Sequence, residues 1–531
     1  MKARLNAILK SADAVALLIT FAASLPLIFR NAVVHDFPMG YAGLFTQMAV
    51  QIADANFALP ASSPFYGPGG IPFAYPPLGL YLLAIFVKTT GSYYIFLRWL
   101  PPFLSLFSVL LTFFLAKQLF LFPTTSHFAS GNASGKEQVR PRNDGIHPFA
   151  AMAIAILTAM SLDLHTAHVW SAGIVRAPAF VFTILFMYFY PAGIGQRSLK
   201  SVILAGMFLG LAFLSHLAYG LFCIFWFISA SFFTRELMRS IRDAIIAGLV
   251  TALVVCLWVV PVVLTHGWDV FWGALNSHGG SQFISGSFHL VDLFRLLYFN
   301  LSPVLSNPLF AIFALVGLFY LLWHRQFRFV FFFFLITLFF PENARFVSWL
   351  GCFAAGYGLW FVSGQLSDWV GKYINIPRYV WVALTLCILW WNGYQSLARF
   401  LPFLTESALD FQAKRAEIFQ EDGAYLALLA QDEAEWLPFL LAREPLVSQW
   451  GSEWLGMYEE QTRLMSLFQG CRREKDWECV KTVVAGMDKA PRFVITNRIE
   501  KKLNEQILAD PLWEEVYANG RYIVWAESEP R

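Results

Sequence analysis

Residues 12–38 read ADAVALLITFAASLPLIFRNAVVHDFP, an almost uninterrupted apolar run that ends at a histidine and an aspartate. Lys2, Arg4 and Lys10 precede the run, as basic residues do in cleavable signal peptides and in membrane anchors. The apolar part continues past the candidate cleavage site at residues 22–24 and reaches about 18 residues, the length that a membrane span needs. We therefore expect an uncleaved anchor helix.

The composition assigns the chain to the membrane class. Of its 531 residues, 57% are hydrophobic and only 14% are charged, and residues 399–531 hold 23 of the 35 acidic residues. This split predicts a transmembrane domain at 1–398 and a soluble domain at 399–531. A net charge of +3 with scattered basic residues argues against a nucleic-acid partner.

Hydropathy predicts about eleven transmembrane helices. Beyond the first, the apolar stretches lie at 94–120, 148–162, 177–193, 200–215, 217–233, 244–265, 308–323, 327–340, 346–363 and 378–396. Residues 75–84 (YPPLGLYLLA) are also apolar, but the run stops at Lys88 after about a dozen residues, which favours a re-entrant or interfacial segment. The first outer loop is then 31–93, with a second, amphipathic interfacial stretch at 41–57.

The distribution of basic residues orients the predicted helices. If residues 75–84 do not span, most basic residues fall on the N-terminal side, which is the cytoplasm by the positive-inside rule. These residues are Lys117, Lys136, Arg140, Arg142, Arg197, Lys200, Arg235, Arg239, Arg242, Arg325, Arg328, Lys372 and Arg378. An odd number of spans then places the C-terminal domain outside the cytoplasm.

The tail reads as a small extracytoplasmic α/β domain. A helix-like pattern at 408–429 precedes strand-like patterns at 492–496 and 521–525. Cys471 and Cys479 lie eight positions apart in this tail. They suit a local disulfide in an oxidising compartment, with two free thiols as the equal alternative.

The outer end of the first helix offers a candidate catalytic group. Asp36, preceded by His35, stands where the apolar run meets the outer loop. A partly desolvated carboxylate there could take a proton from an acceptor hydroxyl as a general base. The simpler interpretation is that Asp36 only caps a helix or marks the water boundary.

Other polar residues of the outer face could complete a site. Asp163, His165 and His168 follow the third span and, with Asp36, could hold a divalent cation, although the spacing matches no tight metal motif. Polar loop residues in water are the alternative interpretation.

Two arginines and a histidine at outer helix ends could bind a phosphate. Arg176 and Arg345 could do so through charge-assisted hydrogen bonds, and His216 lies at the same membrane face. Interfacial arginines also extend to lipid headgroups without any catalytic role.

The order of these features resembles the GT-C superfamily of polytopic glycosyltransferases, which includes protein O-mannosyltransferases, aminoarabinose transferases and oligosaccharyltransferases. The resemblance rests on an apolar anchor ending at Asp36, an amphipathic loop, the stretch 66–75 (YGPGGIPFAY) and then Pro76 and Pro77. Residues 210–216 (GLAFLSH), 343–346 (NARF) and 516–524 (VYANGRYIV) are also similar.

The resemblance implies a GT-C-like bundle and a donor sugar on a polyprenyl phosphate, transferred outside the membrane to a glycan, lipid or protein acceptor. By position Asp36 matches the catalytic acid of the first loop, and Asp163 falls where some members keep a second acid. Tyr66, Tyr75, Pro76 and Pro77 would line the substrate pocket. Paired acids are missing, so the expected mechanism is metal-independent base catalysis by Asp36, with arginines stabilising the departing phosphate and no required cofactor.

Two other function classes fit the same layout. A transporter or flippase for a lipid-linked saccharide would also have many spans, but such proteins carry ionisable residues at mid-membrane, where this chain has few. A non-catalytic family member could act as a scaffold in the cell envelope. In each case the expected location is the plasma membrane, with the N-terminus in the cytoplasm.

Overall fold

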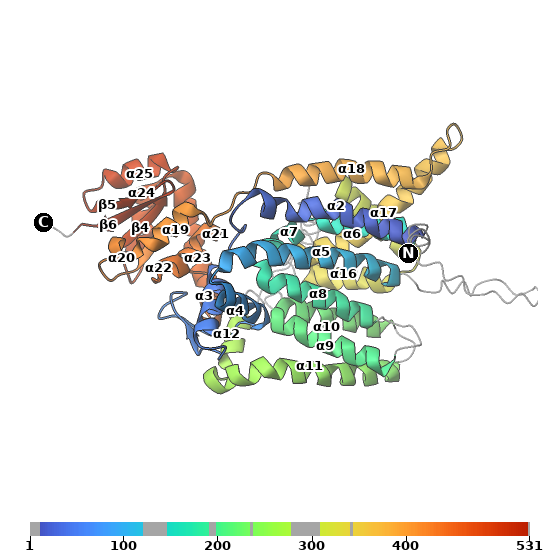
Figure 1. Ribbon diagram of the computed structural model, residues 1–531, viewed down its shortest axis with the longest axis horizontal. Helices are drawn as coiled ribbons and strands as arrows, with labels where there is room; N and C mark the ends of the chain where they lie inside the picture. Colours follow the sequence, from blue (N-terminus) through green and yellow to red (C-terminus); the bar gives the residue numbers. More distant parts are fainter. Residues whose placement is uncertain are drawn as a thin grey trace, which may run out of the picture.

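The computed structural model describes residues 11–119, 146–190, 198–233, 237–277, 308–339 and 344–528. These residues form a bundle of helices and a smaller C-terminal sheet domain (Figure 1). The helix α2 begins at the end of the bundle far from the sheet, and its last turn lies near the C-terminal domain (Figure 1). Asn343 and most of the basic loop at 121–147 lie outside the described residues.

Each of the eleven predicted apolar segments contains a helix. These helices are α2 (Ala12–Val34), α5 (Tyr93–Leu119), α6 (Pro148–Met160), α8 (Gly173–Phe189), α9 (Leu199–Ser215), α10 (Leu217–Phe232), α11 (Leu237–His266), α15 (Pro308–Trp323), α16 (Phe327–Phe339), α17 (Ala344–Val370) and α18 (Arg378–Leu397). Of the described helices, α2, α5, α11 and α17 are each long and apolar enough to cross a membrane. The pair α6 and α7 (Leu162–His168), bent by 63°, would be a fifth span if it acts as one. The full count of eleven stays a prediction.

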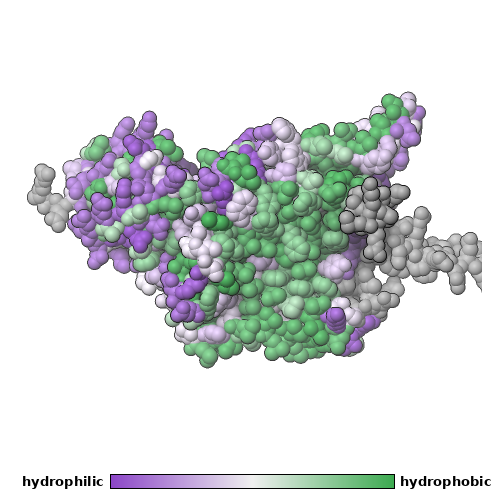
Figure 2. Space-filling view, in the orientation of Figure 1, coloured by the Kyte–Doolittle hydropathy of each residue, from purple (hydrophilic) through white to green (hydrophobic). Residues whose placement is uncertain are grey.

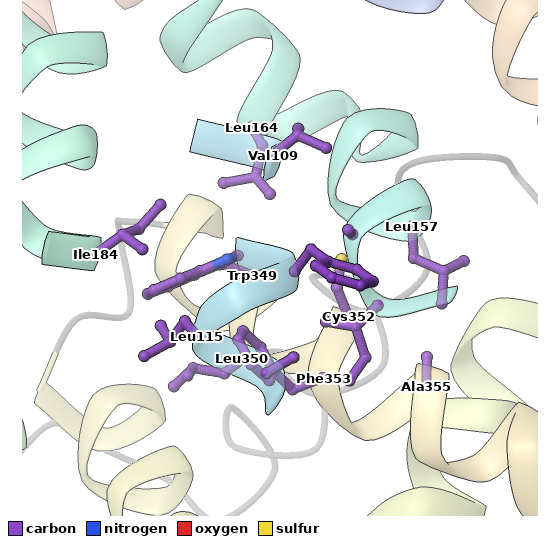
Figure 3. Packing of buried hydrophobic residues seen from close by; sticks show 14 of the residues in the cluster. Val109, Leu115, Leu157, Leu164, Ile184, Trp349, Leu350, Cys352, Phe353 and Ala355 are labelled. Carbon is purple, nitrogen blue, oxygen red and sulfur yellow. The ribbon is translucent and has the colours of Figure 1, made fainter. Parts of the chain in front are cut away.

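Small residues allow the central helices of the bundle to approach closely. A Cβ atom on Gly317 of α15 would lie 1.8 Å from the carbonyl oxygen of Ala354, and one on Gly358 of α17 would lie 1.9 Å from that of Phe313. Glycine at such contacts is typical of helices that pack in a membrane. In the surrounding core, buried side chains such as Trp349 and Phe353 fill the space between helices (Figure 3).

The first outer loop folds over one end of the bundle. It contains α3 (Gly43–Asp54), the short strands β1 (Ser62–Ser63) and β2 (Ile71–Pro72), and α4 (Leu78–Thr90). At 1.5 Å per residue, the 13 residues of α4 extend about 20 Å, less than the roughly 30 Å hydrocarbon core of a bilayer. The predicted spans α6 and α16 also have 13 residues each, so the non-spanning interpretation of α4 stays a prediction.

The C-terminal domain is built on a four-stranded sheet of order β3-β4-β6-β5. Its strands are β3 (Tyr425–Leu428), β4 (Phe493–Asn497), β5 (Trp513–Ala518) and β6 (Tyr522–Glu527). Only the β3–β4 pair is parallel. The remaining elements are α19 (Glu406–Ala413), α20 (Arg415–Ile418), α21 (Gln431–Ala434), α22 (Leu437–Leu441), the 3₁₀ turn η1 (Ser452–Leu455), α23 (Tyr458–Glu474), α24 (Trp477–Ala485) and α25 (Lys501–Leu508).

The helix predicted at 408–429 is wrong in its second half. Helical structure ends at Ile418, Gly423 adopts φ +149°, and Tyr425–Leu428 forms the edge strand β3. The apolar run suits either element, and parallel pairing with β4 decides for the strand. Elsewhere in the domain, Cys471 and Cys479 form a disulfide with their Cα atoms 5.5 Å apart.

Hydropathy separates the two parts of the molecule. In Figure 2 the visible face of the bundle is largely hydrophobic, whereas the C-terminal domain is mostly hydrophilic. Along α11 the leucine side chains at 249, 253 and 257 are largely exposed. Because such a surface is unfavourable in water and favourable in lipid, the bundle is a membrane-embedded domain that carries a hydrophilic one.

Candidate active site at the junction of bundle and C-terminal domain

Two arginines stand at helix ends beneath the C-terminal domain. Arg176 is in the first turn of α8, and Arg345 is the second residue of α17. The Nε atoms of both are buried without a hydrogen-bond partner. Among the described residues neither guanidinium forms an ion pair with a carboxylate, and the two repel each other. Buried cations are normally paired, so the described part of the chain leaves these two guanidinium groups without a counter-ion.

Aromatic side chains hold the two guanidinium groups in place. Arg176 donates a hydrogen bond to the hydroxyl of Tyr41, whose ring centroid lies 5.5 Å from the guanidinium carbon. The guanidinium of Arg345 lies 5.3 Å from the ring centroid of Tyr219 and 5.0 Å from that of Phe346. Such cation–π contacts stabilise a charge without neutralising it. Because a guanidinium has five N–H donors, each arginine keeps donors for a ligand.

Two histidines lie beside Tyr219. His168 hydrogen-bonds to the Tyr219 hydroxyl through Nε2 and to the carbonyl of Leu164 at 2.9 Å through Nδ1. The ring of His216 lies 5.4 Å from that of Tyr219, and its Nδ1 accepts the N–H of Ala218 at the start of α10. Both predicted residues therefore adjoin the Arg345 side of the site.

The C-terminal domain contributes two acidic residues to the site, Glu453 beside Tyr75 and Asp432 near Arg176. The hydroxyl of Tyr75 donates to the carboxylate of Glu453, and burial raises the pKa of Glu453. Asp432 of α21 is half-buried. Burial raises its pKa, and the attraction of Arg176 partly opposes that effect. The predicted pocket residue Tyr75 thus lies where the outer loop meets the C-terminal domain.

Glu435 fixes the C-terminal domain onto the first outer loop. Its carboxylate accepts the backbone N–H groups of Gly43 at 2.6 Å and Leu44 at 2.7 Å. Burial raises the pKa of Glu435 to about 8, although these two hydrogen bonds favour the ionised form. The Tyr66 hydroxyl donates to the Glu435 carbonyl at 2.9 Å. Tyr66 therefore supports the junction rather than exposing its hydroxyl to a pocket.

Asp36 lies at the same end of the bundle, but its contact is with a different arginine. Its carboxylate is 95% exposed and 3.6 Å from Arg98 of α5, so the expectation of a partly desolvated carboxylate is wrong: the side chain extends from the helix end into water. Arg98 also donates to the carbonyls of Ala32 and Asp36. The neighbouring His35 caps α2, and burial followed by the charge of Arg30 lowers its pKa.

The four candidate metal ligands do not form one cluster. Asp163 accepts a hydrogen bond from Ser348, and both ring nitrogens of His168 are occupied. His165 is buried beside a cavity of about 10 Å³, and neither of its ring nitrogens forms a hydrogen bond with a described residue. Within the described ranges, no group of three or more His, Cys, Asp or Glu side chains is arranged to hold a metal ion.

The remaining predicted pocket residues shape the backbone. Pro76 and Pro77 are buried, and Pro77 is the N-cap of α4. Proline at a helix start leaves no backbone donor unsatisfied. The two prolines follow Tyr75 directly and therefore keep the start of α4 close to the site, but they add no polar group to it.

Sequence reasoning missed Tyr41, Tyr219, Asp432, Glu435 and Glu453. One local signal was available for two of these: the acidic run at 432–435 (DEAE) interrupts an otherwise apolar stretch. Charged residues inside such a stretch are buried only at a cost unless they have partners. The two tyrosines have no comparable signal, because aromatic residues are frequent throughout this chain.

Solved structures of one other protein resemble this chain in fold. No family model and no curated protein sequence matches the chain. The structure of ArnT from Cupriavidus metallidurans in the apo state is similar at a TM-score of 0.50 and 12% identity, over 97% of this chain and 98% of that one. The same protein bound to undecaprenyl phosphate gives 0.48 and 14% identity, over 97% and 96%. The apo comparison shows that this chain shares its fold with that ArnT structure over nearly its whole length.

Proposed function

We propose that the protein is a glycosyltransferase that transfers a sugar from a polyprenyl-phosphate donor to an acceptor at the extracytoplasmic membrane surface. The observation that carries the proposal is the pair Arg176 and Arg345, two guanidinium groups at one end of a membrane bundle that form no ion pair with a carboxylate of the described residues. The GT-C fold supports the same reaction class.

A phosphate on a lipid carrier fits this pair chemically. Two cations at a membrane boundary repel each other, and a phosphate between them would convert this repulsion into two charge-assisted attractions. Guanidinium groups match phosphate geometry with paired donors. A polyprenyl chain would occupy lipid along the apolar bundle, and the phosphate would lie at the helix ends.

In the proposed reaction, an acceptor hydroxyl oxygen attacks the anomeric carbon of the sugar. The bond from that carbon to the phosphate oxygen breaks, and its electron pair leaves with the phosphate. Arg176 and Arg345 stabilise the charge that develops there. The acceptor proton goes to a carboxylate, for which Asp36 is our proposal: its side chain is open to an arriving acceptor. No step requires a metal ion.

The orientation in the membrane follows from the same proposal. The C-terminal domain covers the arginine pair, so it lies on the side where the acceptor is glycosylated. A disulfide between Cys471 and Cys479 is stable outside the cytoplasm. The basic loops predicted at the other end of the bundle would then face the cytoplasm.

The test uses the purified protein in lipid nanodiscs with pooled polyprenyl-phosphate sugars. Arg345→Gln and Arg176→Gln should each reduce both transfer and binding of polyprenyl phosphate at least tenfold. Arg399→Gln is the matched control, because Arg399 is exposed just beyond α18. If wild-type protein forms no glycosidic bond but moves labelled lipid across a vesicle, it is a flippase and the proposal is wrong.

A further inference from the structure

Asp432 is an acid without an assigned partner in the candidate site. It lies in α21, is half-buried, and has no hydrogen bond or ion pair with another described residue. Arg176 attracts its carboxylate, and Glu435, three positions later, repels it. A carboxylate beside a phosphate-binding arginine opposes phosphate binding, because both groups are anions. Its presence there therefore calls for a different ligand.

Side-chain contacts of the residues that follow α21 fix the position of this helix and therefore of Asp432. Immediately after α21, Glu435 binds the N–H groups of Gly43 and Leu44, and the Trp436 indole donates to the carbonyl of Gly40 at 2.9 Å. Tyr41, in the same short segment, accepts the hydrogen bond from Arg176. One loop segment thus ties α21 and the arginine together. Figure 1 shows α21 at the junction between the sheet domain and the helices.

The chemistry of a glycosyl phosphate suggests what Asp432 would bind. The group attached to the phosphate is the sugar ring, whose hydroxyls are hydrogen-bond donors. A carboxylate offers only acceptor atoms when ionised, and it cannot bind the phosphate itself. A ligand that spans the two side chains would therefore place its phosphate at Arg176 and a hydroxyl at Asp432.

We propose that Asp432 recognises the donor sugar, by accepting a hydrogen bond from a hydroxyl of the ring attached to the phosphate held by Arg176. This inference rests on the proposed function. It makes the C-terminal domain part of the sugar-binding site and assigns Asp432 a role separate from that of Asp36. Hydrogen bonds to ring hydroxyls also strengthen as positive charge develops on the sugar, so the contact would favour the transition state.

The experiment compares two ligands on the full-length protein in nanodiscs. One is polyprenyl phosphate without sugar, and the other is the pool of polyprenyl-phosphate sugars. Asp432→Asn should bind the sugar-free lipid as well as wild type or up to severalfold more tightly, because a negative charge has been removed. Its kcat/KM for sugar transfer should fall at least tenfold. Asp488→Asn, an exposed acid in the same domain, should change neither quantity.

The outcomes separate the two proposals. Equal weakening of both ligands by Asp432→Asn would mean that Asp432 only supports Arg176, and unchanged sugar transfer would mean that it has no role; either result overturns the inference alone. Wild-type protein that binds neither lipid overturns the proposed function and the inference with it. If the Asp432→Asn variant does not fold, Asp432→Glu replaces it in the experiment, because glutamate keeps the negative charge. The Asp432→Glu variant should still bind polyprenyl phosphate without sugar but should lose sugar transfer. Unchanged transfer by this variant would also contradict the proposed role of Asp432 in sugar recognition.

Discussion

Arg176 on α8 donates a hydrogen bond to the hydroxyl of Tyr41, which is 135 positions earlier in the chain. This contact joins the transmembrane bundle to the first outer loop inside the candidate site. It fixes the direction of one guanidinium edge, so the other edge is available to a ligand.

Replacing Tyr41 by phenylalanine tests that contact directly. Tyr41→Phe keeps the ring beneath the guanidinium but removes the acceptor, and a hydrogen bond to a charged group contributes about 1.5–3 kcal/mol. We expect the KM for the lipid donor to rise about tenfold or more, with kcat less affected. Steady-state kinetics in nanodiscs would measure both. Tyr373→Phe, at a side chain that is 82% exposed, is the control, and an equal effect of both variants would contradict the assignment.

Asp36→Asn tests the proposed general base. Proton transfer by a positioned side chain contributes about 10²–10⁴ in rate, so transfer should fall at least 100-fold while polyprenyl phosphate still binds. Stability should change by less than about 1 kcal/mol, because Asp36, the carboxylate of the ion pair with Arg98, is 95% exposed.

Asp13 provides the control on the same helix. It lies at the other end of α2 and pairs with Lys117, so Asp13→Asn should leave transfer intact. Full activity of Asp36→Asn would require a different proton acceptor, and Asp163 would be the next candidate.

Glu435 predicts a pH dependence of stability. Burial raises its pKa from 4.5 to about 8. Between these values the folded protein keeps a proton that the unfolded chain has lost, so the free energy of unfolding falls as the pH rises, by at most about 1.4 kcal/mol per pH unit. Below pH 4.5 and above pH 8 this contribution is constant.

Thermal unfolding at pH 5, 6, 7 and 8 would measure this dependence by tryptophan fluorescence. Glu435→Gln cannot titrate and should show a flatter profile than wild type. Glu505→Gln, at an exposed position of α25, should keep the wild-type slope. A glutamine variant at 435 with an unchanged slope would assign the pH dependence to other groups.

Sequence patterns predicted the elements better than their contacts. Apolar runs identify the bundle helices because lipid requires a minimum length of apolar residues, and Lys88 falls in the last turn of the short helix α4. Arg176 and Arg345 stood out as charges at the ends of such runs. Tyr41 and Glu435 did not, because their partners are up to 392 positions away and no local pattern encodes that pairing. For the same reason the strand β3 was missed: its parallel partner β4 begins 68 positions later.

Close packing at the centre of the bundle provides the last prediction. A methyl group at Gly358 would lie 1.9 Å from a backbone oxygen of α15, which cannot move without separating the two helices. Gly358→Ala should therefore lower the free energy of unfolding by about 1–3 kcal/mol or more, as overpacked cores do. At Gly248 of α11, a Cβ would meet no atom within 4 Å. Gly248→Ala should be neutral or slightly stabilising, because alanine restricts the unfolded chain. Both changes add one methyl group to a helix, so comparable melting temperatures for the two variants would show that α15 and α17 are not in tight contact.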